Sequence, residues 1–474
     1  MDIFEIAVKS NGDSPLDMTH VCHYWRAVAF DLPCIWSELR IRPWTAREYI
    51  ELVVERSKQI PLEVEINWNK GVGDNGRTHK GMHLAMQTMS RWRTLTLAGF
   101  PAQLDIDMVT EGGNLMTTLA VSQLQALKIT SDCEISDPFA LLLKTVATTS
   151  THRLADVEIT SPDALLFFSS SQYHSFFSHL KRFKVDVRGM KDPVDILPYF
   201  ESLEVLEASG LWLPSYDDDV DLPLVRTLRR MSLKSTSVQW MSERTFPALE
   251  EATIIWPRFH CSLPSPLFPR CTRFTYDYRS IKELPLFCLP KLDKMVVRNN
   301  AWKKGDGSKQ LISVWGGPAN SGWLEPRVLH LDILCYDRDL INALRLLPNL
   351  EELVLGLARP SALGKRFFNS MIARKSKETS SFPGPNSASA QSDRATSDLL
   401  VAPLIPNLKS FGVRYQRWIR GTEEDNVTPL LKEIVQSREK TEVPLRSMRF
   451  WPNKDTPEED ALELVPPRKE LAIT

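Results

Sequence analysis

The residues best suited to chemistry are those of a glycine-rich segment, Gly71-Val72-Gly73-Asp74-Asn75-Gly76. Its G-x-G-x-x-G spacing binds a dinucleotide pyrophosphate when the segment joins a buried strand to a helix. In the strand expected before it, Leu62, Val64 and Ile66 alternate with polar residues, so one face of that strand is wet. A dinucleotide-binding strand is buried on both faces. We therefore interpret the segment as a loop and keep a nucleotide-binding enzyme only as an unfavoured alternative.

Two further groups of polar residues could bind a metal ion. His79 and His83 are four residues apart, which places them on one face of a helix, but the glutamate of an HExxH zinc motif is missing. Asp217-Asp218-Asp219 and Asp221 lack the glycine and terminal glutamate of a calcium-binding loop. We interpret both groups as surface features. The sequence therefore predicts no catalytic residue, no metal site and no cofactor, and we expect that the chain is not an enzyme.

Composition places the chain among folded, water-soluble proteins. Of its 474 residues, 43% are hydrophobic and 25% charged, and the formal net charge is -1. This balance argues against a basic nucleic-acid-binding or membrane-binding surface, and no apolar run is long enough to cross a bilayer. The seven cysteines form no C-x-x-C pair, and the N-terminus does not have the pattern of a secretory signal. We expect an intracellular protein, cytoplasmic or nuclear, with reduced cysteines.

The elements that must position any site are indicated by a recurring pattern, Leu-x-x-Leu-x-Leu. It runs from Trp92/Leu95/Leu97 to Leu445/Met448/Phe450 and includes a copy at Val328/Leu331/Ile333. Successive copies start about 21–32 residues apart, close to the period of leucine-rich repeats. The last two apolar positions of each copy point to one side of a short strand, and stacked copies bury that side in a common core. The sequence predicts an α/β fold: an irregular leucine-rich-repeat solenoid with a parallel sheet on its concave side.

The residue between the two apolar strand positions of each copy should face the open side of the sheet, because side chains alternate along a strand. The predicted row is Thr96, Lys128, Glu158, Lys184, Glu207, Ser232, Thr253, Thr275, Val296, Asp332, Val354, Gly412 and Arg449. Both charge signs occur in this row, so it does not predict a strongly charged partner. Large apolar groups next to the row can anchor an interface. The candidate substrate-binding residues are Lys184, Ile255, Trp256, Arg449 and Trp451.

The interval after Leu350 is unusually long. It contains a stretch rich in Ser, Lys, Gly and Pro between about Arg374 and Asp398, a composition typical of flexible segments. We expect a flexible insertion at about 361–400. Its basic residues, Lys365, Arg366, Arg374, Lys375 and Lys377, are interpreted as part of a solvated linker, and a localisation or phospho-regulated segment is the alternative.

The N-terminal segment has a different pattern. Apolar residues at helical spacing follow the turn-forming residues Asn11 to Pro15, and Leu32-Pro33 ends the run. The stretch SPLDMTHVCHYWRAVAFDLPCIW, with Leu16, Val21-Cys22, Trp25 and Trp36, resembles the F-box family, in particular fungal F-box proteins with irregular leucine-rich repeats. The resemblance covers roughly the first seventy residues, and beyond them it depends on the repeat alone.

The resemblance implies that these helices bind a Skp-type adaptor and, through it, a cullin ubiquitin ligase. The residues that match the apolar positions of the family are Ile3, Phe4, Ile6, Leu16, Val21, Trp25 and Trp36. A helical module this short needs several of them for its own core. We expect Ile3, Phe4 and Leu16 to be nearer the surface, and Val21, Trp25 and Trp36 to be mostly core.

The expected organisation has four parts. Residues 1–44 form the F-box-like module, and 45–90 a connecting helix, strand and loop; 91–455 form the solenoid, and 456–474 a C-terminal tail. The leading hypothesis is a substrate-recruiting adaptor of an SCF-like ligase that binds a protein substrate through the solenoid and has no nucleic-acid or membrane partner. The alternative from another class is a solenoid scaffold without a ligase role.

Overall fold

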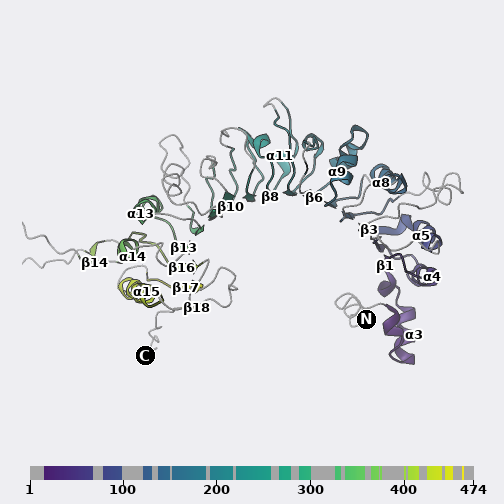
Figure 1. Cartoon of the computed structure of the whole chain (residues 1–474), viewed down its shortest axis with the longest axis horizontal. Helices are drawn as coiled ribbons and strands as arrows, with labels where there is room; N and C mark the ends of the chain where they lie inside the picture. Colours follow the sequence, from purple (N-terminus) through teal and green to yellow (C-terminus); the bar gives the residue numbers. More distant parts are fainter. Residues whose placement is uncertain are drawn as a thin grey trace, which may run out of the picture. The chain divides into compact units, whose positions relative to one another are not determined.

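The computed structural model divides into two compact units, Met1–Met241 and Ser242–Thr474. It describes residues 15–67, 78–98, 121–130, 137–149, 152–187, 190, 193–216, 220–257, 266–278, 288–299, 326–332, 337–357, 365–372, 374–375, 400–401, 404–415, 424–439, 444–451 and 462–463. Both units are α/β, and each contains an open parallel sheet (Figure 1). We describe the units one at a time.

The first unit begins with short helices, α2 (Pro15–Thr19), α3 (His23–Asp31) and the 3-10 helix η1 (Pro33–Trp36). Trp36 is fully buried, and its indole N–H donates a hydrogen bond of 2.7 Å to the carbonyl oxygen of Ala29. Phe30 stacks on Trp36, and the Arg56 guanidinium lies 4.8 Å from the centre of the Phe30 ring. These contacts fix the short helices against the helix that contains Arg56.

The sheet of the first unit follows chain order, and every pair of neighbouring strands is parallel. Its strands are β1 (Glu38–Ile41), β2 (Leu62–Ile66), β3 (Trp92–Leu97), β4 (Ala126–Ile129), β5 (Asp156–Ile159), β6 (Arg182–Asp186), β7 (Val205–Ser209) and β8 (Arg230–Lys234). The connections contain α4 (Arg47–Arg56), α5 (Thr78–Met86), η2 (Met89–Arg91), α8 (Asp137–Thr149), α9 (Pro162–Ser169), η3 (Ser171–Tyr173), α10 (Ser175–Ser178), η4 (Leu197–Tyr199) and α11 (Leu224–Thr227), and η5 (Gln239–Met241) follows β8.

The second unit repeats this arrangement. Its parallel strands, again in chain order, are β9 (Glu251–Ile255), β10 (Arg273–Tyr278), β11 (Lys294–Asn299), β12 (Val328–Asp332), β13 (Glu352–Leu357), β16 (Ser410–Tyr415) and β17 (Ser447–Trp451). The short β18 (Leu462–Glu463) pairs antiparallel with β17. The helices α13 (Asp337–Leu344), α14 (Lys365–Met371) and α15 (Glu424–Arg438) lie on one side of the strands (Figure 1). A separate antiparallel pair joins β14 (Arg374–Lys375) to β15 (Leu400–Val401).

The core of each unit is a set of aligned apolar rows. In the first unit Leu95, Leu127, Val157, Phe183 and Leu206 are register partners on successive strands, and all are buried. The residues between the buried positions are mostly only half-buried, and we call the face that they form the open face. The predicted alternation along the strands is therefore confirmed, as is the α/β class with a parallel sheet.

The second unit shows the same alignment, with one correction. Leu329 pairs with Met295 on β11 and with Leu353 on β13, so the buried positions of β12 are Leu329 and Leu331 rather than the predicted Leu331 and Ile333. The predicted copy at Val328 was shifted by two residues. A shift of two keeps the same side chains on the same face but changes their partners.

Two other expectations about organisation need revision. The parallel sheet begins before residue 91, because β1 and β2 lie in the segments assigned to the helical module and the connector, and β18 lies in the predicted tail. The insertion at 361–400 contains a helix, α14, whose Phe367 and Phe368 are buried. Burial of two aromatic side chains fixes this part of the segment, so the prediction of flexibility is wrong for 365–372. Residues 376–399 lie outside the described parts of the chain.

Candidate functional site

The open face of the first unit carries a ladder of ion pairs. Glu158 on β5 lies between two lysines, with 3.2 Å from its Oε2 to Lys128 Nζ on β4 and 2.9 Å from its Oε1 to Lys184 Nζ on β6. Arg182, also on β6, lies 3.2 Å from Glu207 on β7. Burial alone would raise the pKa of Glu158, but the hydrogen bonds from Lys184 and Lys128 outweigh it and lower that pKa. Charges of opposite sign alternate across these strands, so they largely satisfy one another.

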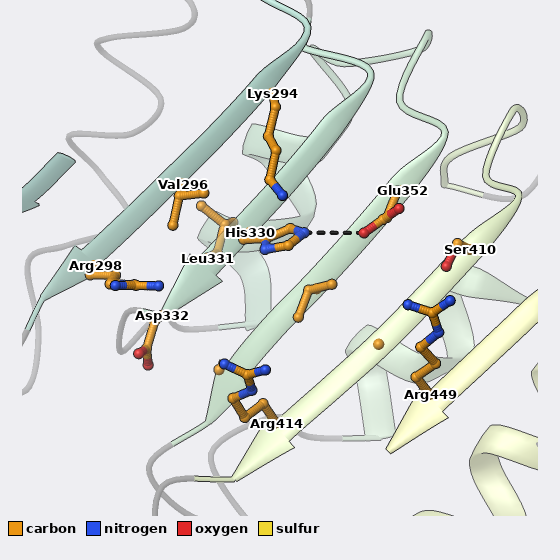
Figure 2. A pocket seen from close by; sticks show the side chains of 13 residues that line it. Lys294, Val296, Arg298, His330, Leu331, Asp332, Glu352, Ser410, Arg414 and Arg449 are labelled. Carbon is orange, nitrogen blue, oxygen red and sulfur yellow. Dashed lines mark hydrogen bonds and ion pairs between the residues drawn. The ribbon is translucent and has the colours of Figure 1, made fainter. Parts of the chain in front are cut away.

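The open face of the second unit is hollowed. A cavity of about 320 Å³ extends over β11, β12, β13, β16 and β17 (Figure 2). Its lining consists of Lys294, Val296, Arg298, His330, Leu331, Asp332, Glu352, Val354, Gly356, Ser410, Gly412, Arg414 and Arg449. We call it the β11–β17 hollow. It lies entirely within the second unit.

Small residues form the hollow. Gly356 on β13 and Gly412 on β16 place no side chain over the sheet, and Val354 between them is short. A Cβ atom added to Gly356 would lie 2.5 Å from Asp332 Oδ1, so the Asp332 side chain occupies the space that a larger residue would take. Longer side chains surround this floor (Figure 2).

A hydrogen bond links two side chains in the hollow. His330 Nε2 on β12 lies 3.1 Å from Glu352 Oε1 on β13 (Figure 2). The hydrogen bond with His330 is the main cause of the lowered pKa of Glu352, and the positive charges of Lys294 and Arg449 add to it. Glu352 is thus an anion held by a hydrogen bond with His330 on β12 and by the positive charges of Lys294 on β11 and Arg449 on β17.

Cationic side chains outnumber the carboxylates around the hollow. Lys294 and Arg298 come from β11, Arg414 from β16 and Arg449 from β17, whereas Asp332 and Glu352 are the two acids. Arg298 and Arg449 are exposed. Within the described residues, no ion pair of 4.0 Å or less joins Lys294, Arg298 or Arg449 to a carboxylate. This distinguishes the hollow from the paired ladder of the first unit.

The predicted substrate-binding residues come from both units, and those in the second unit do not form one cluster. Lys184 belongs to the first unit and is held by Glu158. Ile255 and Trp256 follow one another at the end of β9, whereas Arg449 lies six strands further along the sheet of the second unit, at the hollow. The side chain of Trp451 lies outside the described residues, although its backbone continues β17. Of the four whose side chains are described, Arg449 alone lines the hollow.

Trp256 has a local structural role. Its φ of 48° is in the left-handed region, which is uncommon for a bulky residue. Its backbone N–H and its indole N–H both donate to Asp277 on β10, to the carbonyl oxygen at 2.6 Å and to Oδ1 at 3.2 Å. Asp277 is 5% exposed, so the indole N–H satisfies an oxygen of a buried carboxylate and the backbone N–H satisfies the carbonyl group of the same residue. The geometry accounts for Trp256 without a ligand.

The predicted adaptor-binding residues are distributed differently from the expectation. Leu16 and Trp25 are half-buried and Trp36 is buried. Val21, expected in the core, is 60% exposed, because it lies in the turn between α2 and α3 rather than on a packed helix face. The expectation of a core position is therefore wrong for Val21 and only partly met by Trp25. Ile3, Phe4 and Ile6 lie outside the described residues.

The other motifs are mostly outside the described parts of the chain. This holds for Gly71–Gly76, for Asp217–Asp219 and for the side chain of His79. His83 Nε2 lies 3.2 Å from the side-chain nitrogen of Gln87 on the next turn. Among the described residues, no group of three or more His, Cys, Asp or Glu side chains could hold a metal ion. None of the described helices combines the length and apolar character that a bilayer crossing requires.

Sequence reasoning missed most of the hollow: Lys294, Arg298, His330, Glu352 and Arg414. It considered only the central outward position of each strand, although a strand of five or six residues has up to three such positions. The shifted copy at Val328 also put Asp332 in the place of His330, the true central position of β12. Lys294 and Arg298 lie two residues before and after the predicted Val296, and Glu352 lies two residues before Val354. The alternation of inward and outward side chains, extended to both ends of each strand, identifies these residues.

The chain matches no model of a known protein family, and no curated protein matches it in sequence.

Proposed function

We propose that this chain is a substrate-recruiting subunit of a cullin-type ubiquitin ligase. Its N-terminal helices bind a Skp-type adaptor, and the open face of its sheet binds a protein substrate. In this proposal the N-terminal helices are an F-box-like module, and the stacked strands are an irregular leucine-rich-repeat solenoid. The chain holds its two partners together and has no catalytic role.

The observation that carries the adaptor half of the proposal is an exposed apolar surface on the N-terminal helices. Val21 and Tyr24 are 60% and 72% exposed, and both lie at the junction of α2 and α3. Apolar side chains that gather on an exposed surface are typical of an interaction site. The buried Trp36 and its bond to Ala29 hold α3 in place beneath this surface. The same stretch is the one that resembles the F-box family.

The observation that supports the substrate half is the regular open face. A long row of half-exposed side chains lies on parallel strands whose other face forms the core. Stacked repeats commonly bind partners on such a face, because its side chains are free of core packing.

The adaptor half is tested by co-purification with a Skp-type adaptor. Val21→Asp places a charge in the proposed apolar contact, where it would be buried without a partner, and we expect at least a tenfold loss of recovered adaptor. Trp44→Asp is the matched control, because Trp44 is also apolar and 68% exposed but lies outside the helices. It should retain adaptor binding.

Equal recovery of the adaptor with Val21→Asp and with Trp44→Asp would show that the α2–α3 junction is not the contact. If the unmodified chain recovers no adaptor at all, the ligase proposal fails, and the chain is better explained as a protein-interaction scaffold.

A further inference from the structure

We propose that the β11–β17 hollow binds an acidic, extended segment of a partner protein, whose carboxylates contact Lys294, Arg298, Arg414 and Arg449. The inference deepens the proposed function and rests on its second half, the recruitment of a protein by the open face. It names the chemistry of the recruited segment, which the single row of residues seen in the sequence did not predict.

The charges around the hollow favour an acidic ligand. Four cationic side chains surround two carboxylates, which leaves a surplus of two positive charges while His330 is neutral. Glu352 already has His330 as its partner at 3.1 Å. The exposed Arg298 and Arg449 form no ion pair with any described carboxylate. A ligand with at least two negative charges complements this surplus, and such complementarity favours association and excludes basic partners.

The distance over which the cations are distributed favours an extended ligand. Lys294 and Arg298 are on β11 and Arg449 is on β17, four strand spacings away in the order β11, β12, β13, β16, β17. With neighbouring strands about 4.8 Å apart, the cations extend over roughly 19 Å. One phosphate group is too small to contact all of them. An extended peptide covers the same distance with about six residues at roughly 3.3 Å per residue.

The shape of the floor of the hollow allows a ligand backbone to approach the sheet. Gly412 and the short Val354 leave room for a backbone to come close to the sheet, while Asp332 lies over Gly356 and the longer cationic side chains surround this floor (Figure 2). Side chains of an extended ligand alternate, so every second residue would face this floor and its rim. The segment that fits best therefore has acidic residues at alternate positions.

The test measures binding of a defined probe to the full chain by fluorescence anisotropy, without the adaptor. The probe is a fluorescein-labelled peptide, Gly-Glu-Ala-Glu-Ala-Glu-Gly, and the matched neutral peptide replaces each Glu with Gln. We expect the acidic peptide to bind at least tenfold more tightly than the neutral one, with an affinity that falls as salt is added.

Two variants locate the site. Arg298→Gln with Arg449→Gln should weaken binding of the acidic peptide at least fivefold. Arg182→Gln with Arg230→Gln removes the same charge from the open face of the first unit. This variant should change the affinity for the acidic peptide less than twofold. Both variants change residues with exposed or half-exposed side chains, so the fold is retained. Asp332→Asn removes a negative charge from the hollow and should tighten binding.

Several results would overturn the inference. Equal binding of the acidic and neutral peptides excludes charge recognition, and equal losses in the two double variants exclude the hollow as its location. Binding of a single-phosphoserine version of the neutral peptide, with none of the acidic peptide, would assign a phosphate site instead. Tighter binding of a labelled oligo-dT would point to nucleic acid. Because the adaptor is absent from every arm, failure here leaves the adaptor half of the proposed function to its own test.

Discussion

Lys409 Nζ lies 2.9 Å from Glu351 Oε1, although residues 352–408 separate the two in the sequence. The second oxygen of the same carboxylate lies 2.9 Å from Arg327 Nη2, and Arg327 Nη1 lies 3.7 Å from Asp293 Oδ1. Each of the four residues immediately precedes a strand: β11, β12, β13 or β16. A row of alternating charges therefore links the residues that directly precede these four strands.

Removal of the Glu351 carboxylate should weaken this row of ion pairs in a pH-dependent way. Hydrogen bonds from Arg327 and Lys409 lower the pKa of Glu351 to about 2. Since the folded-state pKa is below the ordinary value of about 4.3, the ionised carboxylate stabilises the folded state above that pH, and the contribution is lost as the pH falls toward 2. Glu351→Gln should lower the free energy of unfolding by about 1 kcal/mol at pH 7, because the pairs are partly exposed. The difference should vanish near pH 2.

Urea unfolding at pH 7, 4 and 2 measures this difference, and Glu433→Gln, on the exposed side of α15, is the control. A difference for Glu351→Gln that stays constant down to pH 2 would show that the ion pairs do not stabilise the fold.

The segment between β14 and β15 should be removable. Lys375 and Leu400 are register partners at the facing ends of an antiparallel pair, so a two-residue Asn-Gly turn can replace 376–399 without moving either strand. Shortening a loop changes its closure entropy by only about 1 kcal/mol, so the melting temperature should move by a few degrees at most. Phe368→Ala, in the buried α14 nearby, should cost about 3–5 kcal/mol. A comparable loss after the replacement would mean that 376–399 packs against the core.

Arg438 should be needed for the packing of α15. Its guanidinium is buried and donates hydrogen bonds to the carbonyl oxygens of Ile405 and Pro406, just before β16. Burial lowers the pKa of Arg438 to about 10, so the group is still charged at pH 7. Arg438→Met keeps an unbranched, largely apolar stem but removes the guanidinium and leaves two carbonyl groups unsatisfied, which should destabilise the chain by about 2–4 kcal/mol. Thermal unfolding monitored by circular dichroism measures the loss, and Lys432→Met, an exposed position on the same helix, should have little effect.

The floor of the hollow should not tolerate a larger residue. A Cβ at position 356 would lie 2.5 Å from Asp332 Oδ1 and 3.0 Å from the Asp332 Cα, so Gly356→Ala should cost about 1–3 kcal/mol. Combining it with Asp332→Ala removes the closer contact and should recover part of that loss in chemical denaturation. Strict additivity of the two substitutions would argue that the side chains do not compete for this space.

The sequence was sufficient to predict most of the strands, because a strand with one buried face requires apolar residues at every second position. The predicted pairs, such as Leu353 with Leu355, are buried and aligned with their neighbours. The single slip, at β12, occurred where Leu329, Leu331 and Ile333 are all apolar and the alternation continues past the strand. Periodicity alone does not fix a register in such a run.

The hollow was not predictable in the same way. It depends on Gly356 and Gly412 being close together on β13 and β16, which are joined by a long connection of unknown path at the sequence level. It also depends on Arg298 and Arg449 lying along one face although they come from distant strands. The repeat indicates which side chains point outward, but the register between strands decides which of them meet.

The antiparallel pairing of β18 with β17 has a consequence for how the protein behaves in solution. An uncovered last strand would offer a row of N–H and C=O groups to any other extended chain, and such edges are a common start of aggregation. Leu462 and Glu463 occupy part of that row, beside Phe450 and Arg449. This short strand thus covers part of one edge of the sheet, and we expect it to limit edge-to-edge assembly between molecules.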